Sequence, residues 1–97
     1  MYGTIARLHP RAGRIDELLT LGDSLRTAPM AGFRASYLFR PDRNPYFRET
    51  MFLVAIFDDA ETYRANASSP EQDARYRELR ELLDDDPEWM DGTFEGG

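Results

Sequence analysis

The sequence predicts a single α+β domain whose elements follow the order strand, helix, strand, strand, helix, strand. Strand patterns occupy residues 2–9, 33–40 and 49–57, and two stretches with apolar side chains at helical spacing lie between and after them. A short closing segment also has strand character. Two amphipathic helices beside one sheet bury their apolar faces most simply on the same side of it. This is the ferredoxin-like arrangement, an antiparallel sheet with two helices on one face.

Length and composition restrict the possible classes of function. The 97 residues fit one domain, 1–97, without a linker. With 18 acidic and 12 basic residues the net charge is −6, which opposes a phosphate backbone and excludes nucleic acid as a partner. The chain has no cysteine, which excludes disulfides and thiolate sites. The longest apolar run, residues 51–57, is far shorter than the ~20 residues of a membrane helix. We therefore expect a cytoplasmic protein without membrane contact.

The first half of the chain is expected to form a strand, a helix and a second strand. Residues 2–9 alternate loosely, and Pro10 and Gly13 then interrupt the pattern. Apolar residues at helical spacing predict a helix over about 13–26. Residues 33–40 alternate with a clean period of two, which predicts a strand with one solvent-facing or interfacial face.

The second half is expected to contain the central strand. Residues 49–57 are apolar on both parities, as in a strand covered on both faces. A short helical stretch follows. Ser69 as N-cap, Pro70 at the first helical position and Gln72 three residues after the cap then predict a capping box that opens the last helix. Residues 89–94 supply a brief last strand.

One face of the predicted sheet has no covering element within the chain. Both helices occupy the other face, and no remaining segment is long enough to shield it. A second copy of the chain, packed sheet against sheet, is the economical solution, and a core of this size gains from an additional apolar interface. We therefore expect a homodimer.

Local motifs for catalysis are weak. His9 is the only histidine and could act as a general base near neutral pH, but its place at a strand end favours a solvated surface histidine. The acidic run at 84–88 offers only carboxylates, so we interpret it as a solvated turn and expect no metal. No Ser, His and Asp arrangement and no glycine-rich phosphate loop is present, which argues against hydrolases, kinases and dinucleotide enzymes.

Aromatic residues are the candidate binding residues, although the sequence identifies no catalytic one. In this fold they could line a cleft between sheet and helices, where planar ligands stack. The competing interpretation, a packed core, is favoured for Phe39 and Phe57. Tyr63 and Tyr76 are the stronger ligand contacts, because a buried hydroxyl needs a polar partner. The expected pocket residues are Tyr37, Phe57, Tyr63, Tyr76 and Trp89.

The loop from Arg40 to Arg48 is a further feature. It holds three arginines and the pair Tyr46 and Phe47. It could be a mobile lip that attracts an anionic substrate, and the favoured interpretation is an exposed hairpin loop.

The chain resembles the antibiotic biosynthesis monooxygenase (ABM) family of dimeric α/β barrels over nearly its whole length. The matching features are a proline and a glycine before the first helix, a glycine and a phenylalanine at the second strand, an acidic end to the third strand, a serine and a proline before the last helix, and a tryptophan in the closing strand. In order, these residues are Pro10, Gly13, Gly32, Phe33, Phe57, Asp58, Asp59, Ala60, Ser69, Pro70 and Trp89.

The resemblance implies a cofactor-independent monooxygenase that oxidises a small or polycyclic phenolic compound. Family members include oxygenases that convert phenolic polycycles to quinones without metal or flavin, and heme-degrading relatives. Heme degraders carry an Asn in the first strand, a Trp ending the third and a His in the second helix. Here Ala6 and Phe57 stand nearest the first two positions and no histidine follows His9, so heme degradation is not expected. A non-catalytic ligand-binding or purely dimeric module, and an isomerase or decarboxylase of related barrels, stay open.

Overall fold

The computed structural model describes residues 1–44 and 48–96. Its elements in chain order are β1 (Tyr2–Leu8), α1 (Ile15–Thr27), β2 (Phe33–Phe39), β3 (Met51–Phe57), α2 (Ala60–Ala67), α3 (Pro70–Glu81) and β4 (Glu88–Thr93). The predicted order is confirmed, and the helical region between β3 and β4 is divided into two helices. No helix in these ranges is long and apolar enough to cross a membrane. Tyr46 and Phe47 of the predicted loop lie outside the described residues.

The break between α2 and α3 follows from local capping. The Ser69 hydroxyl accepts a hydrogen bond from the Gln72 backbone N–H at 3.1 Å, and Pro70 occupies the first turn of α3. The second half of the predicted capping box is wrong. The Gln72 side chain does not return to the Ser69 N–H, because that N–H donates to the Asn66 carbonyl at 3.0 Å. Gln72 is thereby free to bind elsewhere.

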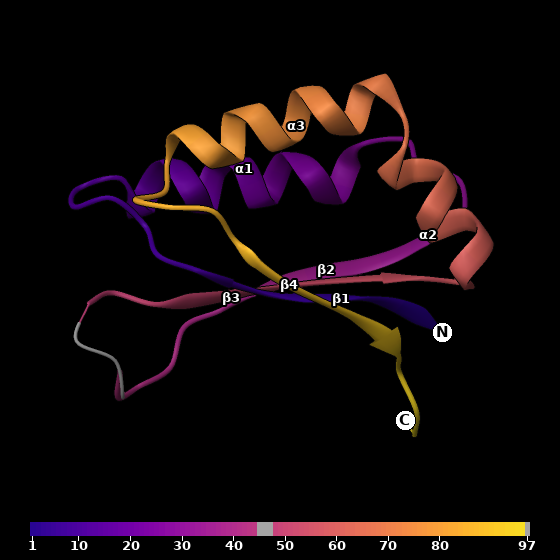
Figure 1. Ribbon diagram of the computed structural model, residues 1–97, viewed down its shortest axis with the longest axis horizontal. Helices are drawn as coiled ribbons and strands as arrows, with labels where there is room; N and C mark the ends of the chain where they lie inside the picture. The colour runs from indigo at the N-terminus through magenta and orange to yellow at the C-terminus, as the bar shows by residue number, and fades with distance from the viewer. Residues whose placement is uncertain (45–47, 97) are drawn as a thin grey trace.

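The four strands form one antiparallel sheet in the order β2-β3-β1-β4. The predicted central position of β3 is confirmed, with β1 beside it. Figure 1 shows α1 and α3 over one face of the sheet and α2 near one end. The sheet of a single chain is open, since β2 and β4 are its edges and do not pair with each other. The ferredoxin-like arrangement is therefore confirmed for one chain.

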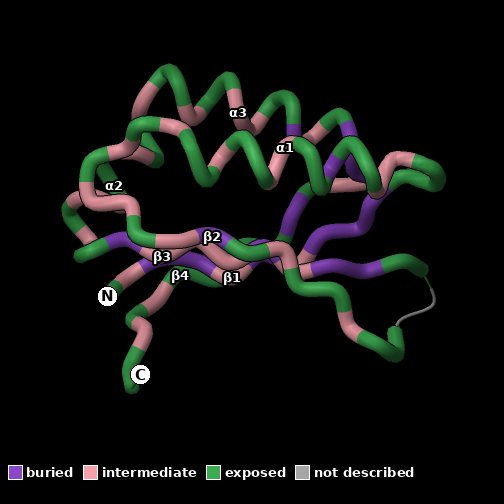
Figure 2. Tube along the Cα trace, turned by 180° about the vertical axis from the view of Figure 1, so that it is seen from behind, coloured by how far each residue is buried: buried purple, intermediate pink, exposed green. Residues whose placement is uncertain are grey.

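The buried core lies toward one end of the space between helices and sheet. It is built from side chains of β1, β3, α1, α3 and the segment after α3, and it leaves α2 without a single buried residue. Figure 2 shows the buried trace along the strands and at the end where α3 returns to the sheet. The core residues are Ala6, Leu8, Leu18, Met51, Leu53, Leu79, Leu82 and Leu83. The other end of the space is therefore not filled by the core.

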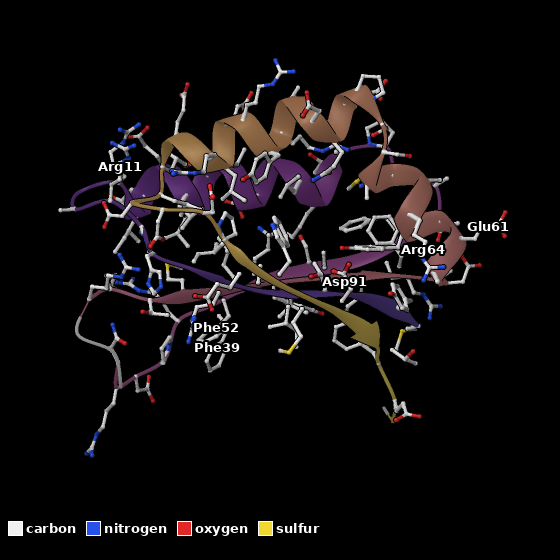
Figure 3. The ribbon with its side chains drawn as sticks, viewed as in Figure 1. Arg11, Phe39, Phe52, Glu61, Arg64 and Asp91 are labelled. Carbon is white, nitrogen blue, oxygen red and sulfur yellow. The ribbon has the colours of Figure 1, made fainter. Side chains whose placement is uncertain are left out.

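The opposite face of the sheet is apolar and has no covering element in the described chain. Tyr37, Phe39 and Met90 there are 60%, 57% and 65% exposed. Phe39 and Phe52 pack against each other across β2 and β3 with ring centroids 6.1 Å apart. Figure 3 shows these two rings on the side of the sheet away from the helices.

Candidate functional site

A cavity of about 450 Å³ lies between the helices and the sheet. Its floor is one row of small residues that the strand register aligns across all four strands: Ser36 beside Ala55, Ala55 beside Thr4, and Thr4 beside Asp91. Because these side chains are short, they leave unfilled the volume that larger residues would occupy. Helices α1, α2 and α3 complete the walls, with leucines from α1 on one side. The volume lies within the range of small-molecule sites.

Two rows of larger side chains border this floor. On one side, Leu38, Leu53 and Trp89 belong to the neighbouring row of the sheet and line the cavity. On the other side, Phe33 and Phe57 close the end wall, with ring centroids 5.6 Å apart. The cavity is therefore a slot between a row of two leucines and a tryptophan on one side and a pair of phenylalanines on the other.

Four of the five predicted pocket residues line this cavity. Phe57, Tyr63, Tyr76 and Trp89 come from β3, α2, α3 and β4 and converge on it. Tyr37 does not line it. The period of two along β2 places Tyr37 beside Val54 on the opposite face of the sheet, while Ser36 and Leu38 face the cavity. Phe57 also belongs to the packed interior, since it is only 2% exposed.

Tyr63 is held by a polar pair and an aromatic cluster. Its hydroxyl donates to Asp91 Oδ1 at 2.8 Å, and its ring meets those of Tyr2 and Phe57 edge to face at 5.4 and 5.6 Å. Burial, then the hydrogen bond to the Asp91 carboxylate, raises the pKa of Tyr63 to about 12, although a hydrogen bond with Thr4 acts in the opposite direction. Tyr63 is therefore a neutral hydrogen-bond donor at neutral pH. Figure 3 shows Asp91 on the helix side of the sheet.

Tyr76 and Trp89 form a second aromatic pair on the cavity wall. Their ring centroids are 6.3 Å apart and tilted by 46°. Among the described residues, no hydrogen bond uses the Tyr76 hydroxyl or the Trp89 indole N–H. The cavity wall therefore carries two donors that are available to a ligand.

A third polar group joins α2 to α3. Arg75 donates from Nε to Gln72 Oε1 at 3.1 Å and from Nη2 to Asn66 Oδ1 at 3.1 Å, and Asn66 Nδ2 donates to Gln72 Oε1 at 3.2 Å. All three residues line the cavity. The side chain that the capping box would have used, Gln72, instead fixes this guanidinium.

His9 lies away from the cavity and is buried, so the expectation of a solvated surface histidine is wrong. It is 6% exposed, with Nδ1 3.2 Å from Thr50 Oγ1 and 3.4 Å from the Glu49 carbonyl. The physical reason is the return of the chain after α3, where the Asp84 N–H donates to the His9 carbonyl at 2.8 Å. His9 therefore has a structural role at the closed end of the domain.

The acidic turn after α3 pairs with arginines. Asp85 lies 2.5 Å from Arg48, and Asp86 lies 2.8 Å from Arg80. The hydrogen bond from Arg48 lowers the pKa of Asp85. No group of three or more possible metal ligands occurs in the described ranges 1–44 and 48–96.

Comparison with known proteins places the fold. No family model matches the chain, and no curated protein does. Solved structures do match. A provisionally named antibiotic biosynthesis monooxygenase from Deinococcus radiodurans aligns with a TM-score of 0.78 at 12% identity, over 100% of this chain and 95% of that one. SnoaB, a cofactor-independent oxygenase from Streptomyces nogalater, aligns with a TM-score of 0.75 at 15% identity, over 99% and 94%. The chain has the fold of these two proteins.

A conserved protein from Methanosarcina mazei Go1 also aligns, with a TM-score of 0.78 at 18% identity over 97% of this chain and 92% of that chain. At such identities the likeness concerns the fold, so the chemistry must be argued from this chain's own cavity.

Sequence reasoning missed the polar residues of the cavity. A usable signal existed for some of them. Asp91 follows Trp89 by two residues on one strand and so shares its face, and Gln72, Arg75 and Tyr76 have the spacing of one helix face. Asn66 joins them only because α2 ends where α3 begins.

Proposed function

We propose that this protein is a cofactor-independent monooxygenase that oxidises a phenolic aromatic compound in the cavity between helices and sheet. The observation that carries the proposal is the slot above Ser36, Ala55, Thr4 and Asp91, bordered by aromatic rings and supplied with the unused donors of Tyr76 and Trp89. The shared fold with SnoaB, whose name describes a cofactor-independent oxygenase, supports the same class of reaction.

The slot suits a planar ring with a hydroxyl group. Leucine side chains and the faces of Tyr76 and Trp89 supply apolar contact for the ring. At one wall, Asp91 uses Oδ1 for the Tyr63 hydroxyl, which leaves Oδ2 to accept a hydrogen bond from a phenol. Tyr63 thus orients Asp91, and Asp91 orients the substrate.

The phenol must lose its proton before the ring can react with oxygen, and this ionisation costs free energy at neutral pH. A phenol of ordinary pKa near 10 costs about 4 kcal/mol to ionise at pH 7. Hydrogen bonds from Tyr76 and Trp89 to the developing oxyanion would offset part of the cost, since preorganised donors in a site shielded from water are worth more than the same donors in solution.

The electron balance requires no external reductant. Oxygen attacks the electron-rich ring carbon opposite the phenolate, the carbon–hydrogen bond there breaks, and a carbonyl forms at that carbon. The second oxygen atom leaves as water with the two hydrogens that the phenol loses. The four electrons that reduce O₂ come from the substrate, so one O₂ is consumed for each quinone produced.

We also propose that the protein acts as a homodimer through the uncovered face of the sheet. Tyr37, Phe39 and Met90 expose large apolar surfaces on that face, and the strand register places Val54 and Ile56 on the same face. Exposed apolar patches of this kind mark association surfaces, and a second sheet would cover them.

Oxygen uptake with a panel of naphthols, dihydroxynaphthalenes and anthrones tests the oxygenase proposal. We expect uptake equimolar with quinone formation, measured by an oxygen electrode and by absorbance. Ala55→Leu places a larger side chain on the cavity floor and should abolish uptake. Tyr37→Phe, on the opposite face, should leave uptake unchanged.

Two variants resolve the roles of the donors. Tyr76→Phe and Trp89→Phe keep an aromatic ring but remove the donor, and each should lower kcat by tenfold or more with a smaller change in KM. Ligand binding that Ala55→Leu abolishes, without turnover of any phenol, would instead identify a non-catalytic binding module and refute the oxygenase.

A further inference from the structure

Arg75 is a cation that the described chain leaves without a carboxylate partner. Within residues 1–44 and 48–96, eight arginines form ion pairs with Asp or Glu, and Arg75 is not among them. Its hydrogen-bond partners among the described residues are two neutral amide oxygens, those of Gln72 and Asn66. The amides fix the guanidinium without neutralising its charge.

The carboxylates of the cavity are engaged elsewhere. Asp91 accepts from the Tyr63 hydroxyl, and Asp73, which also lines the cavity, forms an ion pair with Arg77. A guanidinium has five N–H donors, and the bonds to Gln72 and Asn66 use two of them. Three donors of Arg75 therefore stay available at the edge of an apolar cavity that Arg75 lines.

We propose that Arg75, held by Asn66 and Gln72, binds an anionic group of the ligand, so that the substrate class is an aromatic carboxylic acid that carries a phenol elsewhere on the ring system. A planar guanidinium pairs with a carboxylate through two parallel hydrogen bonds. Asp91 and Arg75 come from different walls, β4 and α3, and offer an acceptor and a cation. A ring system with a hydroxyl and a carboxylate matches both. This inference rests on the proposed use of the cavity as a ligand site.

The net charge of −6 opposes the binding of anions in general, because the overall field of the protein repels them. A preference for an anionic ligand must therefore come from a local cation. The alternative is that Arg75 has only a structural role as a clamp, in which its hydrogen bond to Asn66 holds α3 against α2. Loss of such a clamp would lower thermal stability and weaken charged and neutral ligands alike.

The test compares two ligands that differ mainly in charge, 5-hydroxy-2-naphthoate and 5-hydroxy-2-naphthamide. In both, the ring carbon opposite the hydroxyl carries the hydrogen that the proposed oxidation removes. Their dissociation constants are measured at pH 7 by titration calorimetry under anaerobic conditions, which removes turnover. We expect the carboxylate to bind at least about tenfold more tightly than the amide, and this ratio to fall as salt rises.

Variants assign the preference to one residue. Arg75→Gln should reduce the ratio to about one by weakening only the carboxylate, whereas Arg75→Lys should retain part of it. Arg26→Gln makes the same charge change on α1, where Arg26 pairs with Asp23 away from the cavity, and should leave the ratio unchanged. Equal binding of the two ligands by the unmodified protein, or a ratio that survives Arg75→Gln, would overturn the proposal.

Failure of this inference and failure of the oxygenase are separable. Tight binding of the carboxylate without oxygen uptake would refute the oxygenase and support the anion subsite. Turnover of neutral phenols together with equal binding of the acid and the amide would refute the subsite alone.

Discussion

The Tyr63 hydroxyl is the group whose removal should test the cavity geometry most directly. In Tyr63→Phe the ring keeps its edge-to-face contacts with Tyr2 and Phe57, while the hydrogen bond to Asp91 at 2.8 Å is lost. A hydrogen bond to a charged acceptor contributes about 1.5–3 kcal/mol when it is well shielded. Because Tyr63 is only partly buried and Asp91 is exposed, we expect a loss of about 1–2 kcal/mol in the free energy of unfolding at pH 8.

The pKa of Tyr63 gives the same interaction a second signature. The folded state holds the proton more firmly than the unfolded state, since burial and Asp91 raise the pKa from 10.0 to about 12. The contribution to stability is therefore fully present below pH 10 and is lost as pH rises toward 12. At about 1.36 kcal/mol per pKa unit the full difference would be about 2.7 kcal/mol, and solvent screening reduces it to about 1–2 kcal/mol.

The composition makes this measurement selective. All 12 basic residues are arginines, so no lysine titrates between pH 10 and 12. Absorbance of tyrosinate should show a late ionisation step from Tyr63, and this step should be missing in Tyr63→Phe. Urea unfolding of the two proteins should differ at pH 8 and converge near pH 12. A late step that persists in the variant, or an equal difference in stability at both pH values, would refute the reasoning.

Three further predictions concern the fold and the assembly. Gly32 has φ +74° and an added Cβ would lie 2.5 Å from the Thr62 hydroxyl, so Gly32→Ala should lower the free energy of unfolding by about 2–4 kcal/mol. Gly13→Ala is the control, with φ +78° but open space around it, and should lower the free energy of unfolding by only about 1–2 kcal/mol. Equal melting temperatures of the two variants would contradict this prediction. Ser69→Ala removes the N-cap of α3 and should cost about 1 kcal/mol, or about 4–8 °C in Tm; an unchanged Tm would show that the cap is dispensable. Tyr37→Glu should convert a dimer to a folded monomer in light scattering, and a monomeric unmodified protein would remove the proposed interface.

The elements that sequence predicted well depend on local patterns. The period of two in β2, the doubly apolar β3 and the cap at Ser69 each reflect contacts within a few residues, and the structure places strands or helix starts there. His9 was misjudged for the opposite reason. Its burial depends on the chain returning after α3, some 75 residues later, and no pattern near Pro10 records that return.

The pocket shows the same division. Tyr63 and Tyr76 could be predicted because they are aromatic residues on the inner faces of helices. Tyr37 was predicted wrongly, because side chains alternate along β2 and that of Tyr37 lies on the other side of the sheet. The role of Gln72 also depended on tertiary structure. A capping box needs only local spacing, yet Gln72 binds Arg75 and Asn66 because α2 and α3 meet at that point.

The sequence by itself determined which segments become strands and helices and in what order, because side-chain periodicity and helix capping act over a few residues. Only the tertiary structure decided that Ser36, Ala55, Thr4 and Asp91 form one row, because their alignment depends on the register of four strands that lie far apart in the chain. That register places short side chains together, and their shortness leaves the cavity open.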